Sequence, residues 1–312
     1  RFMKTPIFID AIEASLDSSR KALSGGRTEA FMLGNIPEKV YCLDINSMYP
    51  SVMKGNKYPV RLEATRKFPQ MYQLDYFISQ GDCSILAEVD IHTDEPVYPL
   101  KTDSHTVFPV GKFTTHLMTP ELLYAREHDH IDKVRRLYIY EDADIFSDYV
   151  DHFWSIRQQA IKEGDEVTNW LSKMFLSNLY GKFSQRGQVW DEVGESEYID
   201  CHFWVEANEG KLIKMRRFAG IEEKMIEETE SRDSFPAIAA QVTSYARIYL
   251  WKLIQMAGRE NVFYCDTDSL MVNADGYDNL KHLIDPYKLG ALKLEWESEN
   301  FQINGLKDYV ID

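Results

Sequence analysis

The chain has 312 residues, 44% of them hydrophobic and 13% aromatic, so it can bury a large core in about two domains or one elaborated domain. Its net charge of −15 comes from 50 acidic and 35 basic side chains, and a field of that sign disfavours nucleic acid as a partner unless local basic patches offset it. We find no apolar run of transmembrane length and no signal peptide, so we expect a soluble, cytoplasmic protein without a membrane partner.

Three blocks of the chain differ in the pattern of their residues. Residues 1–53 end in a short apolar run and a turn, 54–150 mix short β-like runs with turns and a short helix, and 151–312 hold two strong helices and several strands. Strands and helices do not alternate regularly, which is typical of an α+β fold.

The stretch YCLDINSMYPSVM (41–53) places a carboxylate at the end of an apolar, β-prone run. Asp44 is unfavourable there unless it sits at the exposed end of the strand or binds something. Ser47 is a candidate cap for a helix that starts at Met48, and Pro50 is tolerated in a first turn. We therefore expect a strand-to-helix turn whose backbone N–H groups suit phosphate.

A helix is predicted near the centre of the chain, over TNWLSKMFLSNLYGKF (168–183). At 100° per residue its apolar side chains fall on one broad arc, which also includes Asn178. Lys173, Ser177 and Tyr180 share a narrow opposite arc. Gly181 is placed where a helix would end. For Lys173, a solvated face and a cleft-lining role remain open.

A second helix is predicted from Pro236, and NVFYCDTDSLMV (261–272) follows it as a β-hairpin with acids at the tip. Strand periodicity places Asp266 and Asp268 on one side of the hairpin. Two such close like charges are costly unless a cation neutralises them, and Mg²⁺ does so with oxygen ligands and substrate phosphates. An Asx-rich turn without a ligand is the alternative interpretation of these acids.

Asp44 provides a third carboxylate in a comparable setting. Together with the helical Lys173 and the phosphate-ready turn after Asp44, the acids at 266 and 268 indicate a two-metal phosphoryl-transfer site.

Five segments of the chain resemble motifs of the family B DNA polymerases. DINSMYPS (44–51) is similar to motif A, KMFLSNLYG (173–181) to motif B, and YCDTDS (264–269) to motif C, in the order that the family has. GLKDYV (305–310) resembles the KxY motif, and LSGGRTE (23–29) resembles the YxGG segment that joins the exonuclease and polymerase modules. The resemblance implies a right-hand palm, an antiparallel sheet with packed helices, plus helical fingers and β-rich insertions.

Within family B, the chain resembles the protein-primed subgroup of the Bacillus podovirus and adenovirus type. The segment before motif B, the β-rich stretch between motifs B and C, and DPYKLGALKLEWE (285–297) carry this likeness. The resemblance implies the following segments: the start of the palm with motif A (1–53), a first insertion with palm elements (54–150), fingers (151–183), a second β-rich insertion (184–233), and palm with motif C and KxY (234–312).

The same resemblance implies the metal ligands of a DNA-directed DNA polymerase. Asp44 and Asp268 would bridge two Mg²⁺ ions, for which Mn²⁺ is a substitute, Asp266 would assist them, and the Ile45 carbonyl would be a further ligand. The implied partners are primer–template DNA and deoxynucleoside triphosphates, with a terminal protein primer as a further candidate.

Roles in substrate binding follow from the resemblance for further residues. The implied nucleotide-binding residues include Ser47 and Met48, through their amides, and Tyr49 under the sugar. Lys173 would bind the triphosphate together with Arg157 or, as second choice, Lys162. Ser177, Asn178 and Tyr180 would lie at the nascent base pair. The implied primer and DNA contacts are Lys307, Tyr309, Gly25, Gly26 and Gly181.

The sequence departs from the family pattern in three ways. Leu23 replaces the YxGG tyrosine, which puts exonuclease coordination through that residue in doubt. Ser177-Asn178 inverts the order of motif B and places the smaller serine on the cleft face. The chain begins at Arg1, has only 22 residues before the YxGG-like segment and 3 after Tyr309, so we expect exonuclease and thumb segments to be missing.

Two alternatives compete with a polymerase core. A docking or scaffold module derived from a polymerase would keep the fold without the activity, but would have no reason to retain costly clustered acids. A reverse transcriptase or another palm nucleotidyltransferase shares the carboxylates, but would not be expected to carry both the SxYP turn and the KxY pair. The basic runs KVRR (133–136) and KMRR (214–217) are candidate phosphate contacts or plain solvated surface.

Overall fold

The computed structural model describes residues 4–8, 12–102, 105–208, 211–231 and 233–311. It divides into two compact units, residues 1–180 with 235–312 and residues 181–234, which are considered separately below. None of the helices in the described part of the chain combines the length and hydropathy needed to cross a membrane.

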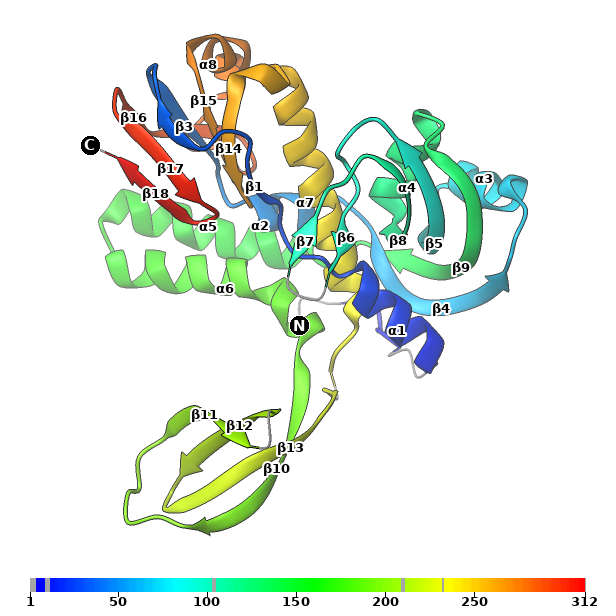
Figure 1. The fold of residues 1–312 in the computed structure, drawn as a ribbon, viewed down its shortest axis with the longest axis vertical. Coiled ribbons are helices and arrows are strands. Elements are labelled where there is room, and N and C mark those ends of the chain that lie inside the picture. Colours follow the sequence, from blue (N-terminus) through cyan, green and yellow to red (C-terminus); the bar gives the residue numbers. More distant parts are fainter. Residues whose placement is uncertain (1–3, 9–11, 103–104, 209–210, 232, 312) are drawn as a thin grey trace. The chain divides into compact units, whose positions relative to one another are not determined.

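The larger unit is built on a five-stranded antiparallel sheet with the order β1-β14-β15-β3-β16 (Figure 1). Its strands are β1 (Thr28–Ala30), β3 (Val40–Ile45), β14 (Val262–Asp266), β15 (Ser269–Val272) and β16 (Leu292–Ser298). The predicted hairpin over 261–272 is thus confirmed as β14 and β15. Strands β3 and β15 are neighbours although paired residues such as Asp44 and Ser269 are 225 positions apart, which brings the two acidic segments together.

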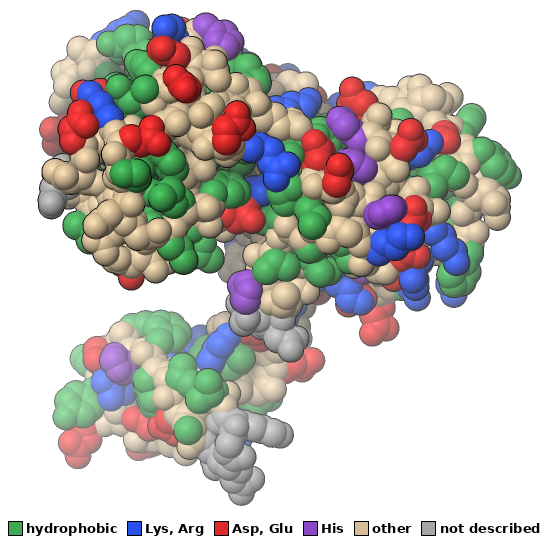
Figure 2. Space-filling view, turned by 45° about the horizontal axis from the view of Figure 1, so that its top comes forward, with side chains coloured by type: hydrophobic (Ala, Val, Ile, Leu, Met, Phe, Trp, Pro, Cys, Tyr) green, Lys and Arg blue, Asp and Glu red, His purple; other side chains and the backbone are tan. Residues whose placement is uncertain are grey.

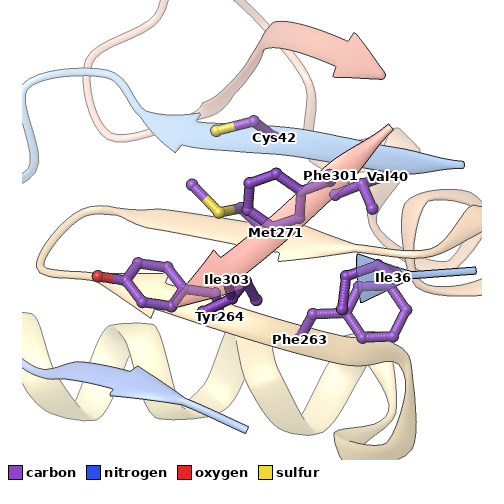
Figure 3. Packing of buried hydrophobic residues seen from close by; sticks show 8 residues of the cluster. All are labelled: Ile36, Val40, Cys42, Phe263, Tyr264, Met271, Phe301 and Ile303. Carbon is purple, nitrogen blue, oxygen red and sulfur yellow. The ribbon is translucent and has the colours of Figure 1, made fainter. Parts of the chain in front are cut away.

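A small second sheet packs against the first. It consists of β2 (Gly34–Ile36), β17 (Phe301–Gly305) and β18 (Asp308–Ile311). Buried side chains from both sheets form one cluster (Figure 3), made of Ile36, Val40, Cys42, Phe263, Tyr264, Met271, Phe301 and Ile303. Burial of this apolar surface fixes the ends of β3 and β14, where the acids lie.

The predicted second helix is confirmed as α7 (Pro236–Ala257), and 17 of its 22 residues are buried. It contacts α1 (Glu13–Ala22), α2 (Met48–Met53), α4 (Thr119–Glu127) and α8 (Ala274–Leu280). Two short 3₁₀ turns, Arg259–Asn261 and Lys281–Leu283, complete this region. Small residues such as Ala239 and Ala240 permit this close packing.

A four-stranded antiparallel sheet with the order β4-β9-β5-β8 occupies residues 58–143. Its strands are β4 (Tyr58–Lys67), β5 (Cys83–Thr93), β8 (Gly111–Met118) and β9 (Ile131–Ala143), with α3 (Met71–Gln80) and a small pair, β6 (Leu100–Lys101) and β7 (Thr106–Val107), beside them. Lys and Arg side chains gather over this sheet on the face shown in Figure 2. Two basic side chains of β9 are paired with acids of β5, since Arg135 contacts Asp90 at 2.7 Å and Arg136 contacts Glu88 at 3.4 Å.

Two helices follow, α5 (Ser147–Glu163) and α6 (Glu166–Ser184). The helix predicted over 168–183 corresponds to α6. Its predicted end at Gly181 is wrong, because Gly181 keeps a helical backbone and α6 continues to Ser184. The apolar arc of α6 is largely exposed, with Trp170 at 59% and Phe175 at 51%, so this helix does not bury its apolar face within the described residues.

The smaller unit is a four-stranded antiparallel sheet with the order β10-β13-β12-β11. Its strands are β10 (Arg186–Glu195), β11 (His202–Asn208), β12 (Lys211–Phe218) and β13 (Ile221–Glu230). Arg216 lies over the Trp190 ring at 4.4 Å and contacts Glu223 at 2.6 Å. The KMRR run therefore has local partners in this sheet.

Candidate active site

Asp44 lies in β3 between two neighbouring strands. Its cross-strand partners are Ser269 of β15 and Lys293 of β16. The side chain is 18% exposed, and its Oδ1 lies 3.1 Å from the Lys293 Nζ. The register of three strands thus holds this carboxylate at the end of a buried strand.

Asp268 lies in the two-residue turn between β14 and β15, and not in a strand. Thr267, the first turn residue, has φ of 58°, and its N–H donates to the Arg27 carbonyl at 2.6 Å. The Asp268 carbonyl accepts from the Ile45 N–H at 2.7 Å, which ties the turn to the end of β3. The strand periodicity from which Asp266 and Asp268 are predicted to share one side of the hairpin does not extend to Asp268, because this residue lies within the turn.

The Asp266 side chain contacts a different set of residues from that of Asp268. Thr28 donates to its Oδ1 at 2.8 Å, and the Lys307 Nζ lies 3.3 Å from the same oxygen. Lys307 lies in the turn before β18 with φ of 60°, and its N–H donates to the Tyr264 hydroxyl at 2.7 Å. The Tyr309 ring lies 5.6 Å from the Tyr264 ring, so both residues of the KxY motif gather beside Asp266.

A cavity of about 350 Å³ brings most of the predicted residues together. Its walls come from β3, the strand-to-helix turn, α5, α6, the β14–β15 turn and β16. The lining residues are Asp44, Ile45, Asn46, Ser47, Met48, Tyr49, Pro50, Arg157, Lys173, Ser177, Tyr180, Asp268, Lys293 and Glu295. Lys173, Ser177 and Tyr180 therefore lie on the cleft face of α6, as the helical wheel predicts.

Ser47 is the N-cap residue of α2 but does not cap it, contrary to the prediction. Its backbone is left-handed, with φ of 53°, and its side chain makes no capping hydrogen bond. Instead, the Ser47 hydroxyl accepts from the Arg157 Nη1 at 2.7 Å. Arg157 also donates to the Asn169 side chain at 3.2 Å, and burial lowers its pKa. The turn and α5 thus hold a half-buried guanidinium in the cavity wall.

The Tyr49 ring lies 4.2 Å from the Tyr180 ring across the cavity. Burial, with a contribution from Tyr180, raises the pKa of Tyr49, so the phenol is neutral at ordinary pH. Met48 is 2% exposed, so its side chain is not available to a ligand.

Several predicted residues lie outside this cavity. Lys162 is exposed in the last turn of α5, and Asn178 is exposed on α6, so neither is a lining residue. Gly181 belongs to the smaller unit and is not a lining residue either. The preference for Arg157 over Lys162 agrees with the geometry, and the serine of the inverted pair is the one that faces the cavity.

The two glycines before β1 lie beside the β14–β15 turn. A Cβ on Gly26 would lie 2.7 Å from a Thr267 side-chain carbon, so only glycine fits without a shift. Gly25 has φ of 72°, and its carbonyl accepts from the Arg247 Nη1 at 2.6 Å. Arg247 is paired at 2.7 Å with Glu121, and both side chains are buried.

Sequence reasoning missed Arg247, Lys293 and Glu295. Arg247 lies within a helix whose pattern indicates only a core element, and no local signal marks it. Lys293 and Glu295 alternate with apolar residues in a strand, which is the ordinary pattern of a solvated face. Only the strand register with Asp44 reveals them.

The acids of the cavity repel one another. Burial, followed by the charge of Asp44, raises the pKa of Asp268 to about 6. Burial also raises the pKa of Asp44, although Lys293 opposes this effect. Two close, half-buried carboxylates with a carbonyl beside them fit a divalent cation, which would relieve this repulsion. No group of three or more His, Cys, Asp or Glu side chains suited to a metal occurs among the described residues, so substrate oxygens would have to complete the coordination.

The family model for DNA polymerase type B, organellar and viral, matches residues 6–257. The chain belongs to this family. The DNA-directed DNA polymerase of Enterobacteria phage PRD1 is 26% identical, covering 97% of this chain and 52% of that protein. The probable DNA polymerase of Neurospora intermedia is 24% identical, covering 91% and 30%. These matches confirm the predicted family, and the phage relative agrees with the predicted protein-primed subgroup.

Solved structures share the fold. Phi29 DNA polymerase, complexed with primer-template DNA and incoming nucleotide substrates, has a TM-score of 0.71 at 20% identity, covering 98% of this chain and 52% of that one. The predicted mixed fold with antiparallel sheets is confirmed by this likeness. The chain spans between 30% and 52% of the length of the relatives named here.

Proposed function

We propose that the chain is the core of a DNA-directed DNA polymerase that adds deoxynucleotides to a primer 3′-end. One observation carries the proposal: the Asp44 and Asp268 carboxylates share a cavity with Arg157 and Lys173. Acids suited to a cation and bases suited to a triphosphate therefore line one space, as phosphoryl transfer requires.

Asp44, Asp268 and the Ile45 carbonyl would hold Mg²⁺, with Mn²⁺ as a substitute, and Asp266 would steady the turn through Thr28 and Lys307. When bound, two such ions stabilise charge on the attacking and leaving oxygens of an in-line displacement. The contribution of the chain is to hold the two carboxylates at fixed positions by the β3 register and the β14–β15 turn.

The opposite wall would bind the nucleotide. The Arg157 guanidinium and the Lys173 ammonium would pair with triphosphate oxygens, and the amides of Ser47 and Met48 would donate to them. Tyr49 would lie under the sugar and exclude a 2′-hydroxyl. Ser177 and Tyr180 would contact the nascent base pair from α6.

Primer–template DNA is the proposed partner of the surface beside the cavity. Lys307 and Tyr309 would contact the primer end, and Gly25 and Gly26 would let the strand approach the backbone closely. The phi29 structures with primer-template DNA and nucleotide support these partners by likeness of fold. Lys162, Asn178 and Gly181 are not needed for the proposed nucleotide contacts.

We assign the chain to a protein-primed viral, plasmid or mobile-element replication system acting in the cytoplasm, with a terminal protein as a further partner. Residues 1–53, 54–150, 151–183, 184–233 and 234–312 would serve as the start of the palm, first insertion, fingers, second insertion and end of the palm. The phage and fungal relatives support this assignment.

Single-nucleotide primer extension with Mg²⁺ tests the proposal. The parent should extend the primer, and Asp44→Asn should reduce the rate by at least about 10²-fold, the order of effect expected when a charged group at the reacting centre is lost. Asp82→Asn, an exposed acid outside the cavity, is the matched control and should behave as the parent. A parent that does not extend the primer would favour the inactive scaffold module, and equal, measurable rates for the parent and Asp44→Asn would refute the role of Asp44.

A further inference from the structure

Lys293 is placed between the proposed metal ligand and a second carboxylate. Its Nζ lies 3.1 Å from the Asp44 Oδ1 and 3.2 Å from the Glu295 Oε1. Glu295 lies at an irregularity of β16, between Leu294 and Trp296, and its side chain is on the same side of the strand as Lys293, which it contacts. All three line the same cavity.

The two acids differ in their surroundings. The Asp44 side chain is 18% exposed, whereas the Glu295 side chain is 46% exposed. A lone carboxylate costs more free energy at the more buried position, so Asp44 has the greater need of a counter-ion when no other cation is present. Glu295 can be left solvated or paired at little cost.

The same Asp44 oxygen cannot serve an ammonium and a divalent cation together without strong repulsion between the two cations. A cation that uses this oxygen must therefore displace Lys293. The lysine stem is flexible, and Glu295 is already within contact distance to receive it.

We propose that Lys293 is an internal counter-ion that occupies Asp44 in the metal-free chain and is transferred to Glu295 when a divalent cation binds. Lys293 is thus a positioning residue that weakens metal binding to the empty site and keeps Asp44 in place until the metal arrives. This inference rests on the metal site of the proposed function.

Titration of the purified chain with Mn²⁺, followed by the EPR signal of the free ion, tests the competition directly. Lys293→Met should bind Mn²⁺ roughly three- to tenfold more tightly than the parent, the factor expected from removing one partly buried ion pair. Lys293→Gln is a second neutral variant and should give the same shift. Lys252→Met, which removes an exposed positive charge outside this cavity, should bind as the parent does. Unchanged or weaker binding in both neutral variants would overturn the proposal.

A double-mutant cycle tests the transfer to Glu295. Glu295→Gln should weaken Mn²⁺ binding several-fold in the parent, because the displaced lysine loses its second partner, and should have no effect in the Lys293→Met background. If Glu295 binds the metal itself, the loss persists in that background, and the transfer is refuted.

The failure of the metal site can be told apart from the failure of this inference. Asp268→Asn should abolish the Mn²⁺ binding of the parent. Binding that is absent in the parent, or unaffected by Asp268→Asn, would overturn the proposed metal site and the role of Lys293 with it. Binding that requires Asp268 but ignores Lys293 would overturn the role of Lys293 alone.

Discussion

Tyr49 has the most direct consequence for substrate choice among the residues of the cavity. Its ring is half-buried and lies 4.2 Å from the Tyr180 ring, between the metal side and the base-pair side of the cavity. In the proposed site, a sugar placed there would contact the ring face, and the ring would exclude an added hydroxyl group.

Replacing this ring opens that volume. Tyr49→Val should reduce the preference for deoxynucleotides over ribonucleotides by roughly 10- to 200-fold, the range typical of one steric contact in a binding pocket. Steady-state incorporation of both nucleotide types gives the ratio. Tyr41→Val, whose ring stacks on Tyr277 at 4.5 Å outside the cavity, controls for damage to β3. An unchanged ratio in Tyr49→Val would refute the placement of the sugar against the Tyr49 ring.

The local sequence predicts some of these residues and not others. Asp44, Lys173 and Tyr180 can be predicted because an acid at the end of an apolar run and a polar arc on a helix are local patterns. Lys293 cannot, because its significance comes from pairing with a strand 249 positions earlier in the chain, at Asp44. Likewise, the side chain of Ser47 looks like a helix cap until Arg157 is brought to it from α5.

At the scale of elements, the close approach of Gly26 to the β14–β15 turn limits where Asp268 can lie. A Cβ at Gly26 would meet Thr267 side-chain atoms at 2.7, 2.8 and 3.1 Å. Because Thr267 precedes Asp268 directly, a shift of this turn would move the carboxylate.

Gly26→Ala should therefore lower the free energy of unfolding by about 1–3 kcal/mol, as overpacking does, and slow incorporation. Thermal denaturation and single-turnover kinetics measure the two effects. Thr267→Gly removes the contacting atoms and suits the φ of 58°, so the double variant should recover both properties. Recovery of neither would mean that the clash is not the cause.

Local sequence patterns predict that a helix or strand exists more reliably than they predict what surrounds it. The α7 helix and the β14–β15 hairpin are predicted because their patterns run over many residues. The end of α6 was predicted too early, because glycine is only permitted, and not required, to end a helix, and Gly181 remains helical. The apolar arc of α6 also differs from what amphipathic spacing normally implies, since Trp170 and Phe175 remain 59% and 51% exposed.

Across the whole molecule, burial is distributed unevenly between the two units. In the described part of the smaller unit, the only apolar side chains that are buried are Phe183 and Met215. In the larger unit, α7 and the β3 and β14 strands are almost fully buried. Local opening is easier where few apolar contacts oppose it.

Amide hydrogen exchange should therefore be faster in β10–β13 than in α7, β3 and β14. Mass spectrometry of peptides from the intact chain measures the difference, and the protection factors should differ by at least about tenfold. Equal protection in both units would show that the smaller sheet is as stable as the larger unit.

At the scale of the whole molecule, the net charge of the chain differs from the charge of the cavity walls. The net charge of −15 disfavours DNA as a partner, yet the cavity walls balance three basic residues, Arg157, Lys173 and Lys293, against three acids, Asp44, Asp268 and Glu295. A local balance of this kind cannot be read from composition, because it depends on which strands and helices meet.

Asp268 lines the cavity and Asp266 does not, so Asp268 is the acid of motif C that would face the reacting phosphate in the proposed site. Single-nucleotide primer extension by the intact chain with Asp268→Asn and Asp266→Asn tests it. We expect a loss of at least about 10²-fold for Asp268→Asn and of roughly tenfold for Asp266→Asn, because Asp266 acts only through its contacts with Thr28 and Lys307. A larger loss for Asp266→Asn than for Asp268→Asn would show that Asp268 is not the principal acid of the site.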